Sequence, residues 1–134
     1  TGAAPSVDAL QLLPSGRVTV KKSSNSEVTA LDITDIGGEI VEIDMDAANN
    51  FSLEIDANFE LQNPTNMTVG QSGCIVMTMD SVSAYTWTFE GSPVWKFEGG
   101  TVPELSTSTS AVDNLVYYVA SPTSIHAVLL KDMS

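Results

Sequence analysis

Cysteine and histidine, two residue types that often support chemistry, are nearly absent from this sequence of 134 residues. It contains one cysteine and one histidine, so it cannot form an intramolecular disulfide and has too few ligands for a typical zinc site. No apolar run approaches the roughly 20 residues needed to cross a bilayer. We therefore expect a single compact domain that needs neither metal nor disulfide for its core and that has no membrane partner.

Positive charge is also scarce, with 5 Lys and Arg residues against 17 Asp and Glu residues and a formal net charge of −12. Such a balance repels phosphate backbones, so we expect no nucleic-acid partner. Ten acidic residues follow one another without an intervening Lys or Arg: Glu27, Asp32, Asp35, Glu39, Glu42, Asp44, Asp46, Glu54, Asp56 and Glu60. This run favours a solvated acidic face, and a cation site or a surface for a basic partner are the alternatives.

The candidates for nucleophilic and acid–base chemistry are weak. His126 has Ser124 and Asp113 as its nearest partners in the sequence, but no Gly-x-Ser-x-Gly turn accompanies them. The acidic run could place two carboxylates close together by chance, which is not a specific signal of glycoside hydrolysis. Cys74 lies between apolar neighbours, where cysteine usually behaves as a small buried hydrophobe. We expect no catalytic residues, and we predict that the protein is not an enzyme.

Ligand-binding motifs are equally weak. Asp44 and Asp46, followed by Asn49 and Asn50, offer oxygen ligands suited to calcium, but the glycine and distal glutamate of an EF-hand loop are missing. No Gly-Lys-Ser/Thr sequence follows the glycines of residues 99–100, so they are expected to form a bend and not a phosphate loop. We therefore predict no metal-binding residues, no cofactor-binding residues and no cofactor.

Apolar and polar residues alternate with a period of two along most of the chain from residue 28 onward. Tyr85, Trp87 and Phe89, for example, alternate with threonines. Residues 71–79 are apolar on both sides of the alternation, which indicates a central strand that is covered on both faces or contacts another subunit. No segment has a helical stripe with a capping signal. The pattern predicts an all-β fold, an antiparallel β-sandwich or a jelly-roll-like arrangement, with residues 46–50 as a hairpin connection.

The same alternation predicts the core of this domain, which we place at residues 28–134. The expected core residues are Val41, Ile43, Phe51, Leu53, Ile55, Leu61, Ile75, Met77, Trp87, Phe97, Leu115, Tyr117 and Val128.

Residues 1–27 contain turn signals and one short alternating segment, which indicates an extended N-terminal arm. Arg17, Lys21 and Lys22 make this arm basic, so it could lie on an acidic neighbour, including another copy of the chain. Aromatic side chains are the other candidates for subunit or partner contact, and they could form a sugar-binding platform if exposed. The candidate contact residues are Arg17, Lys21, Lys22, Trp87, Trp95 and Tyr118.

Residues 36–133 contain a succession of motifs that resembles a known module. Its most specific part is residues 95–107, Trp-Lys-Phe-Glu-Gly-Gly-Thr-Val-Pro-Glu-Leu-Ser-Thr. Asn-Asn-Phe-Ser-Leu at residues 49–53 and Leu-Gln-Asn-Pro-Thr-Asn at residues 61–66 precede it, and Ser-Ile-His-Ala-Val at residues 124–128 follows it. In order and content these motifs resemble a C-terminal module of bacteriophage virion proteins, namely tail fibres, head fibres and capsid-decoration proteins.

This resemblance implies a non-enzymatic β-sandwich that assembles, often as a trimer, on a phage particle. We therefore expect a capsid-decoration or cement protein at the surface of the virion, with copies of itself and the major capsid or other virion proteins as partners. A tail- or head-fibre module that recognises a host glycan is the alternative. The chain departs from the family pattern at residues 79–84, where many relatives have a Gln-Asp-Gly-Thr-Gly-like hairpin.

Overall fold

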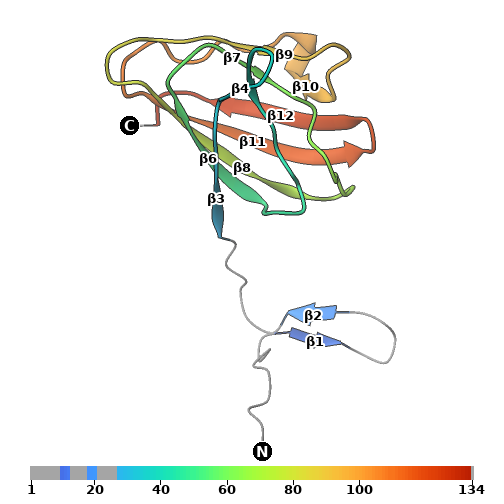
Figure 1. Cartoon of the computed structure of the whole chain (residues 1–134). Helices are drawn as coiled ribbons and strands as arrows, with labels where there is room; N and C mark the ends of the chain where they lie inside the picture. The colour runs from blue at the N-terminus through green and yellow to red at the C-terminus, as the bar shows by residue number, and fades with distance from the viewer. Residues whose placement is uncertain (1–9, 13–17, 21–26, 134) are drawn as a thin grey trace, which may run out of the picture.

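The computed structural model describes residues 10–12, 18–20 and 27–133, and their regular structure is almost entirely β (Figure 1). One short 3₁₀ turn, η1 (Glu98–Gly100), is the only helical element among these residues. The strands are β1 (Leu10–Leu12), β2 (Val18–Val20), β3 (Val28–Leu31), β4 (Thr34–Asp35), β5 (Glu39–Val41), β6 (Asn50–Ile55), β7 (Phe59–Leu61), β8 (Ser72–Met79), β9 (Trp87–Phe89), β10 (Trp95–Phe97), β11 (Val112–Ser121) and β12 (Ser124–Leu130). The predicted all-β class is confirmed.

The strands form three sheets. The largest has six strands in the order β10-β12-β11-β8-β6-β3, and a second has four strands in the order β4-β5-β7-β9. β1 and β2 pair with each other as a separate antiparallel sheet. β8 lies in the interior of the six-stranded sheet, as the sequence predicts. The division into an arm of residues 1–27 and a domain of residues 28–134 stays a prediction, because most of the arm lies outside the described residues.

Strand direction differs from the antiparallel prediction. Five of the nine strand pairings among the described residues are parallel and four are antiparallel. Three of the parallel pairings, β5 with β7, β7 with β9 and β6 with β8, arise because the chain alternates between the two larger sheets from β5 to β10, so neighbours in one sheet are separated by a strand of the other. Each return to a sheet then repeats the previous direction, without the helical crossover that usually joins parallel strands.

The predicted hairpin at residues 46–50 is wrong for the same reason. This connection leads from the segment after β5, in the four-stranded sheet, to β6 in the six-stranded sheet. Its small residues and asparagines suit a turn, but turn chemistry does not specify which sheet the next strand joins. The hairpin between β11 and β12 does form, with Ser121 opposite Ser124 and a local irregularity in register.

One hydrophobic core receives side chains from both larger sheets. Its fully buried members include Phe51 and Leu53 from the six-stranded sheet and Val41 and Leu61 from the four-stranded sheet. Eleven of the thirteen predicted core residues are buried. Phe97 is only partly buried at the edge strand β10. The prediction that Val128 belongs to the core is wrong, because Ile125 and Ala127 occupy the inward positions of β12 and Val128 is 55% exposed.

Aromatic side chains close the body where β9 and β10 form the edges of the two sheets. The ring of Trp87 lies 5.0 Å from that of Phe89 and 6.1 Å from that of Phe97. Phe89 and Phe97 are themselves in an edge-to-face arrangement at 5.6 Å. Such pairs add to the free energy of burial, so this cluster holds the two sheets together at one side.

Residues 98–110 connect β10 to β11 and cover one end of the core. Gly99 and Gly100 have φ angles of 66° and 73°, a left-handed conformation that confirms the predicted need for glycine in this bend. The carbonyl of Pro103 accepts a hydrogen bond of 2.9 Å from the indole of Trp87, and Leu105 is buried. We refer to residues 98–110 as the strap.

The buried carboxylate of Asp113 holds the strap and the C-terminal segment against β11. Asp113 is 3% exposed and accepts hydrogen bonds from the backbone nitrogen of Ser106 at 2.7 Å and from its hydroxyl at 2.6 Å. It also accepts a hydrogen bond of 2.8 Å from the backbone nitrogen of Asp132. A buried carboxylate is tolerated only when hydrogen bonds satisfy it, as these three do.

Candidate functional site: an exposed apolar sheet face

The six-stranded sheet has one face in the core and one face toward solvent, and the solvent side is unusually apolar. We refer to this solvent side as the outer face. Among the described residues, eleven large hydrophobic residues are exposed, and six of them lie on the outer face. The other five lie outside the strands. The six on the outer face are Val28 (60% exposed), Val76 (36%), Val116 (41%), Tyr118 (50%), Val128 (55%) and Leu130 (42%).

Strand register brings these side chains together. Asn50 of β6 pairs with Val28 of β3 on one side and with Cys74 of β8 on the other. Cys74 is opposite Val116 of β11, which is opposite Val128 of β12. These five residues form one continuous row across five strands. Because side chains alternate between the two faces of a strand, all five point to the same side, and the row contains no charge.

A shallow depression lies at one end of the outer face. Tyr118 is opposite His126, and Lys96 of β10 is opposite His126 on the other side of β12. These residues line the depression together with Ser72, Glu98 and Val116. The amine of Lys96 donates a hydrogen bond of 2.8 Å to the carbonyl of Pro93, so this cation is held at the rim. An aromatic ring beside polar groups at a rim suits a hydroxyl-rich or a protein ligand.

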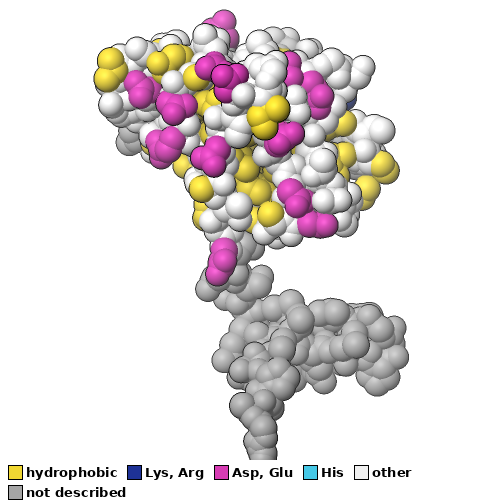
Figure 2. Space-filling view, in the orientation of Figure 1, with side chains coloured by type: hydrophobic (Ala, Val, Ile, Leu, Met, Phe, Trp, Pro, Cys, Tyr) yellow, Lys and Arg dark blue, Asp and Glu magenta, His cyan; other side chains and the backbone are white. Residues whose placement is uncertain are grey.

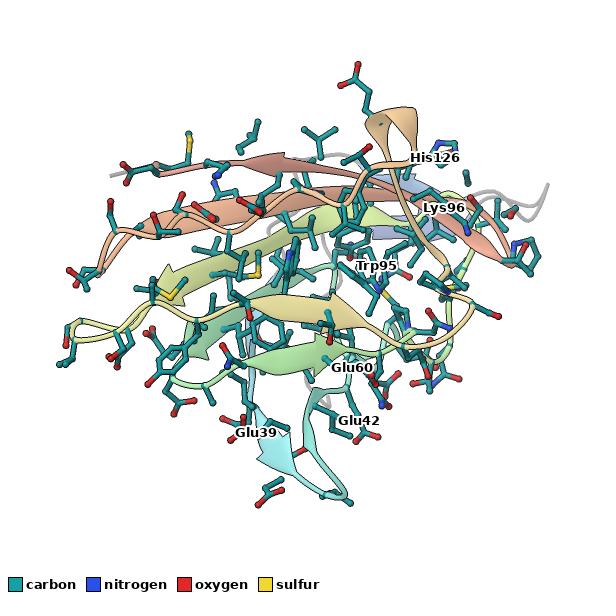
Figure 3. The ribbon with its side chains drawn as sticks, turned by 90° about the horizontal axis from the view of Figure 1, so that it is seen from above. Glu39, Glu42, Glu60, Trp95, Lys96 and His126 are labelled. Carbon is teal, nitrogen blue, oxygen red and sulfur yellow. The ribbon has the colours of Figure 1, made fainter. Side chains whose placement is uncertain are left out.

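Acidic residues gather elsewhere on the body. In Figure 3, Glu39, Glu42 and Glu60 lie along the four-stranded sheet, Lys96 and His126 lie on the opposite side, and Trp95 lies between them. Figure 2 shows many Asp and Glu side chains spread over one side of the body, with hydrophobic side chains exposed between them. Nine of the ten residues of the acidic run are exposed, as expected for solvated charges, and Glu54 is the one that projects from the outer face. The centre of the outer face differs from the acidic surface because its row of five residues is uncharged.

The structure places the six candidate contact residues in three kinds of environment. Arg17, Lys21 and Lys22 lie outside the described residues. Trp87 is 7% exposed and Trp95 is 3% exposed, so a partner at the surface would touch little of either ring. Trp95 packs edge-to-face against Tyr117 at 6.2 Å and donates a hydrogen bond to the carbonyl of Gln62. Of the three candidates for which the structure describes the side chain, only Tyr118 presents it to solvent, on the outer face.

The residues weighed for catalysis do not converge. His126 is exposed on the outer face, whereas Asp113 is buried and engaged by Ser106 and Asp132. The register of β11 and β12 places Asp113 near the end of the sheet away from Tyr118 and His126. Asp113 and His126 are therefore separated both along the sheet and by its two faces, and no Ser-His-Asp arrangement forms from these residues.

The oxygen ligands weighed for calcium are engaged within the chain. Asp44 accepts hydrogen bonds from the side chain of Asn66 at 2.8 Å and from the backbone nitrogen of Asp46 at 3.0 Å. These bonds, that of Asn66 first, lower the pKa of the exposed Asp44 carboxyl below its ordinary value. Within the described residues, no group of three or more His, Cys, Asp or Glu side chains is arranged to hold a metal ion.

Cys74 lies half-buried in the middle of the outer face. Burial raises the pKa of its thiol above the ordinary value, because the low-dielectric surroundings disfavour the thiolate. A raised thiol pKa reduces the fraction of the nucleophilic form at neutral pH, which agrees with the expectation of an unreactive cysteine.

Sequence reasoning did not identify the outer face as a surface, although one signal pointed to it. Residues 71–79 are apolar at consecutive positions, and the prediction included contact with another subunit as one explanation. The exposure of the other valines and of Leu130 could not be predicted, because alternation alone does not tell which face of a strand is inward. The assignment of Val128 to the core is an example.

Comparison with known proteins adds no assignment. A scan against protein-family models, a search of curated proteins and a search of solved structures each find no match to this chain. In the parts of the chain that the structure describes, no helix is long and apolar enough to cross a membrane.

Proposed function

We propose that this chain is a non-enzymatic structural protein of a bacteriophage particle: a β-sandwich module that decorates the capsid and associates with copies of itself as a trimer. The observation that carries the proposal is the outer face, which exposes six large apolar side chains on the solvent side of the six-stranded sheet. Exposed apolar patches of this kind mark interaction surfaces, because water disfavours them in an isolated chain.

The resemblance of residues 95–107 to modules of phage virion proteins is the reason for proposing a phage particle as the place of this protein. In this protein the same residues build the edge strand β10, the left-handed bend at Gly99 and Gly100, and the strap that closes the core. These residues make packing contacts within the chain, and the side chains of Trp95 and Leu105 are buried in the core. A motif used in this way favours a packing module over a site for chemistry.

The distribution of charge supports association with neighbours on the particle. Three of the five basic residues lie within residues 1–27, whereas residues 28–134 are strongly acidic. Opposite charges attract over distances of about 10 Å at moderate ionic strength. The arm of one copy is therefore suited to the acidic body of the next, or to an acidic capsid protein.

Electron cryomicroscopy of the phage particles tests the proposal. The expected result is density for the two-sheet body at repeated positions on the capsid surface, in contact with the major capsid protein. Density confined to the tail tip would reject decoration and favour the fibre alternative. Particles without this chain, to which the purified chain does not bind, would reject a virion role.

A fibre module that recognises host glycan is the second candidate, and the depression beside Tyr118 and His126 is the observation in its favour. Binding of the purified chain to host cells, lost in Tyr118→Ala with folding retained, would support this function. A chain that does not bind host cells at micromolar concentration would contradict it.

A further inference from the structure

The outer face is large enough to form an interface of modest size. Its six strands, about 4.8 Å apart, span about 24 Å, and the outward residues of β8 and β12 extend about 20 Å along these strands. Covering a surface of this size on two copies buries about 1,000 Å², which is near the lower limit for specific protein interfaces.

The charges of the described residues indicate what kind of molecule can cover the outer face. The described part of the chain contains only two lysines, Lys96 and Lys131, among many carboxylates, so two copies repel each other over most of their surfaces. The centre of the outer face is the exception, since Cys74, Val76, Val116 and Val128 carry no charge at neutral pH. This neutral centre is the part of the surface at which a second acidic copy can approach without repulsion.

The shape of the outer face also favours a second copy of this chain as the molecule that covers it. Valine side chains at regular spacing on a pleated surface are suited to pack against a second sheet about 10 Å away. An extended basic segment or a nucleic acid would find no acidic or basic partner in this row, and a glycan would find mainly aliphatic side chains there.

We propose that the outer faces of separate copies of this chain pack against one another, sheet against sheet, with Val116 and Val128 at the centre of the contact. This inference rests on the self-association contained in the proposed function and assigns the surface that carries it. Tyr118 and Leu130 flank the contact along β11 and β12, and Cys74 is covered by it.

The test is the mass of the full chain by light scattering, compared with the 14.2 kDa of one copy. The wild type is expected above the mass of one copy at tens of micromolar: twice this mass supports the face contact and contradicts the proposed trimer, and three times this mass supports both. Val116→Lys and Val128→Lys each place an uncompensated charge in the apolar contact and are expected at the mass of one copy. Their exposed positions should tolerate lysine, and circular dichroism confirms that the variants remain folded.

Val82→Lys is the matched control, since Val82 is 81% exposed in a loop away from the sheet. It should keep the mass of the wild type. If both face variants also keep that mass, the interface lies elsewhere, and the inference fails while self-association stands. If the wild type has the mass of one copy up to 100 μM, the inference is overturned; particle imaging then decides the virion role independently.

Discussion

At Gly73 the backbone that precedes β6 lies directly over β8. A Cβ atom at this position would meet the carbonyl oxygen of Asn49 at 1.8 Å and the hydroxyl of Tyr117 at 2.9 Å. That hydroxyl already donates a hydrogen bond of 2.6 Å to the same carbonyl. Glycine is therefore required here for close approach and not for an unusual φ angle, since Gly73 is outside the positive-φ set.

Gly73→Ala is expected to lower the free energy of unfolding by about 3 kcal/mol, because backbone must move to admit the methyl group. Gly91→Ala is the control, because a Cβ there meets nothing within 4 Å and the φ of Gly91 is not positive. Urea denaturation measures both. Equal stability of the two variants would show that the carbonyl of Asn49 does not lie over Gly73 as described.

Tyr117 gives the protein an alkaline pH dependence. Burial raises the pKa of its phenol above the ordinary value of 10.0, and a hydrogen bond with Gln71 opposes this only in part. The folded protein therefore keeps the proton at pH values where the unfolded chain releases it. The resulting stability is complete below about pH 10 and is lost as the pH rises from there through the raised pKa.

Tyr117→Phe should flatten this alkaline loss while costing about 1 kcal/mol at neutral pH for the missing hydrogen bond. Thermal unfolding from pH 8 to pH 11 provides the measurement, with Tyr118→Phe as a control on the same strand. A Tyr117→Phe protein that loses stability as steeply as the wild type above pH 10 would contradict the assignment.

At the scale of elements, periodicity predicts strands well but not their partners. The alternation at residues 51–55 locates most of β6, and that at residues 85–89 contains all of β9 but begins two residues too early, because one buried face leaves a regular trace in the sequence. Parallel pairing and the crossing at residues 46–50 could not be predicted, since pairing depends on which sheet a strand joins after each turn. The buried role of Asp113 was also hidden, because its partners come from the strap and the C-terminal segment.

The junction of β9, β10 and the strap depends on Trp87. Trp87→Ala should lower the free energy of unfolding by about 3 to 5 kcal/mol, the cost of a large cavity. Trp87→Phe keeps an aromatic ring but loses the hydrogen bond to Pro103, so it should cost less. Guanidinium denaturation compares the two. If Trp87→Phe is as damaging as Trp87→Ala, the ring contacts with Phe89 and Phe97 are not the main contribution.

The attachment of the strap depends on Asp113. Asp113→Ala leaves the buried amide and hydroxyl of Ser106 without their acceptor and should cost about 3 kcal/mol. It should also make the strap accessible to protease before the strands are cut. Limited proteolysis with mass spectrometry locates the first cut, and a first cut outside residues 98–110 in the variant would contradict the role of Asp113.

At the scale of the whole molecule, an uncharged apolar area lies at the centre of one sheet face although the chain is strongly acidic. The acidic composition and the surplus of apolar residues in β8 can both be read from the sequence. The apolar area cannot, because β8, which carries Val76, is distant in the chain from β11 and β12, which carry Val116 and Val128, and adjoins β11 only in the sheet. In an isolated copy of this protein, the apolar side chains of the outer face stay exposed to water.

The rate at which Cys74 reacts with a thiol reagent tests the central claim most directly, because this thiol lies in the middle of the outer face. At constant pH, the account predicts that labelling of the wild type slows as protein concentration rises, while the labelling rate of Val128→Lys does not depend on concentration. A wild-type rate that is constant from nanomolar to high micromolar protein would show that the face stays uncovered and would contradict the account.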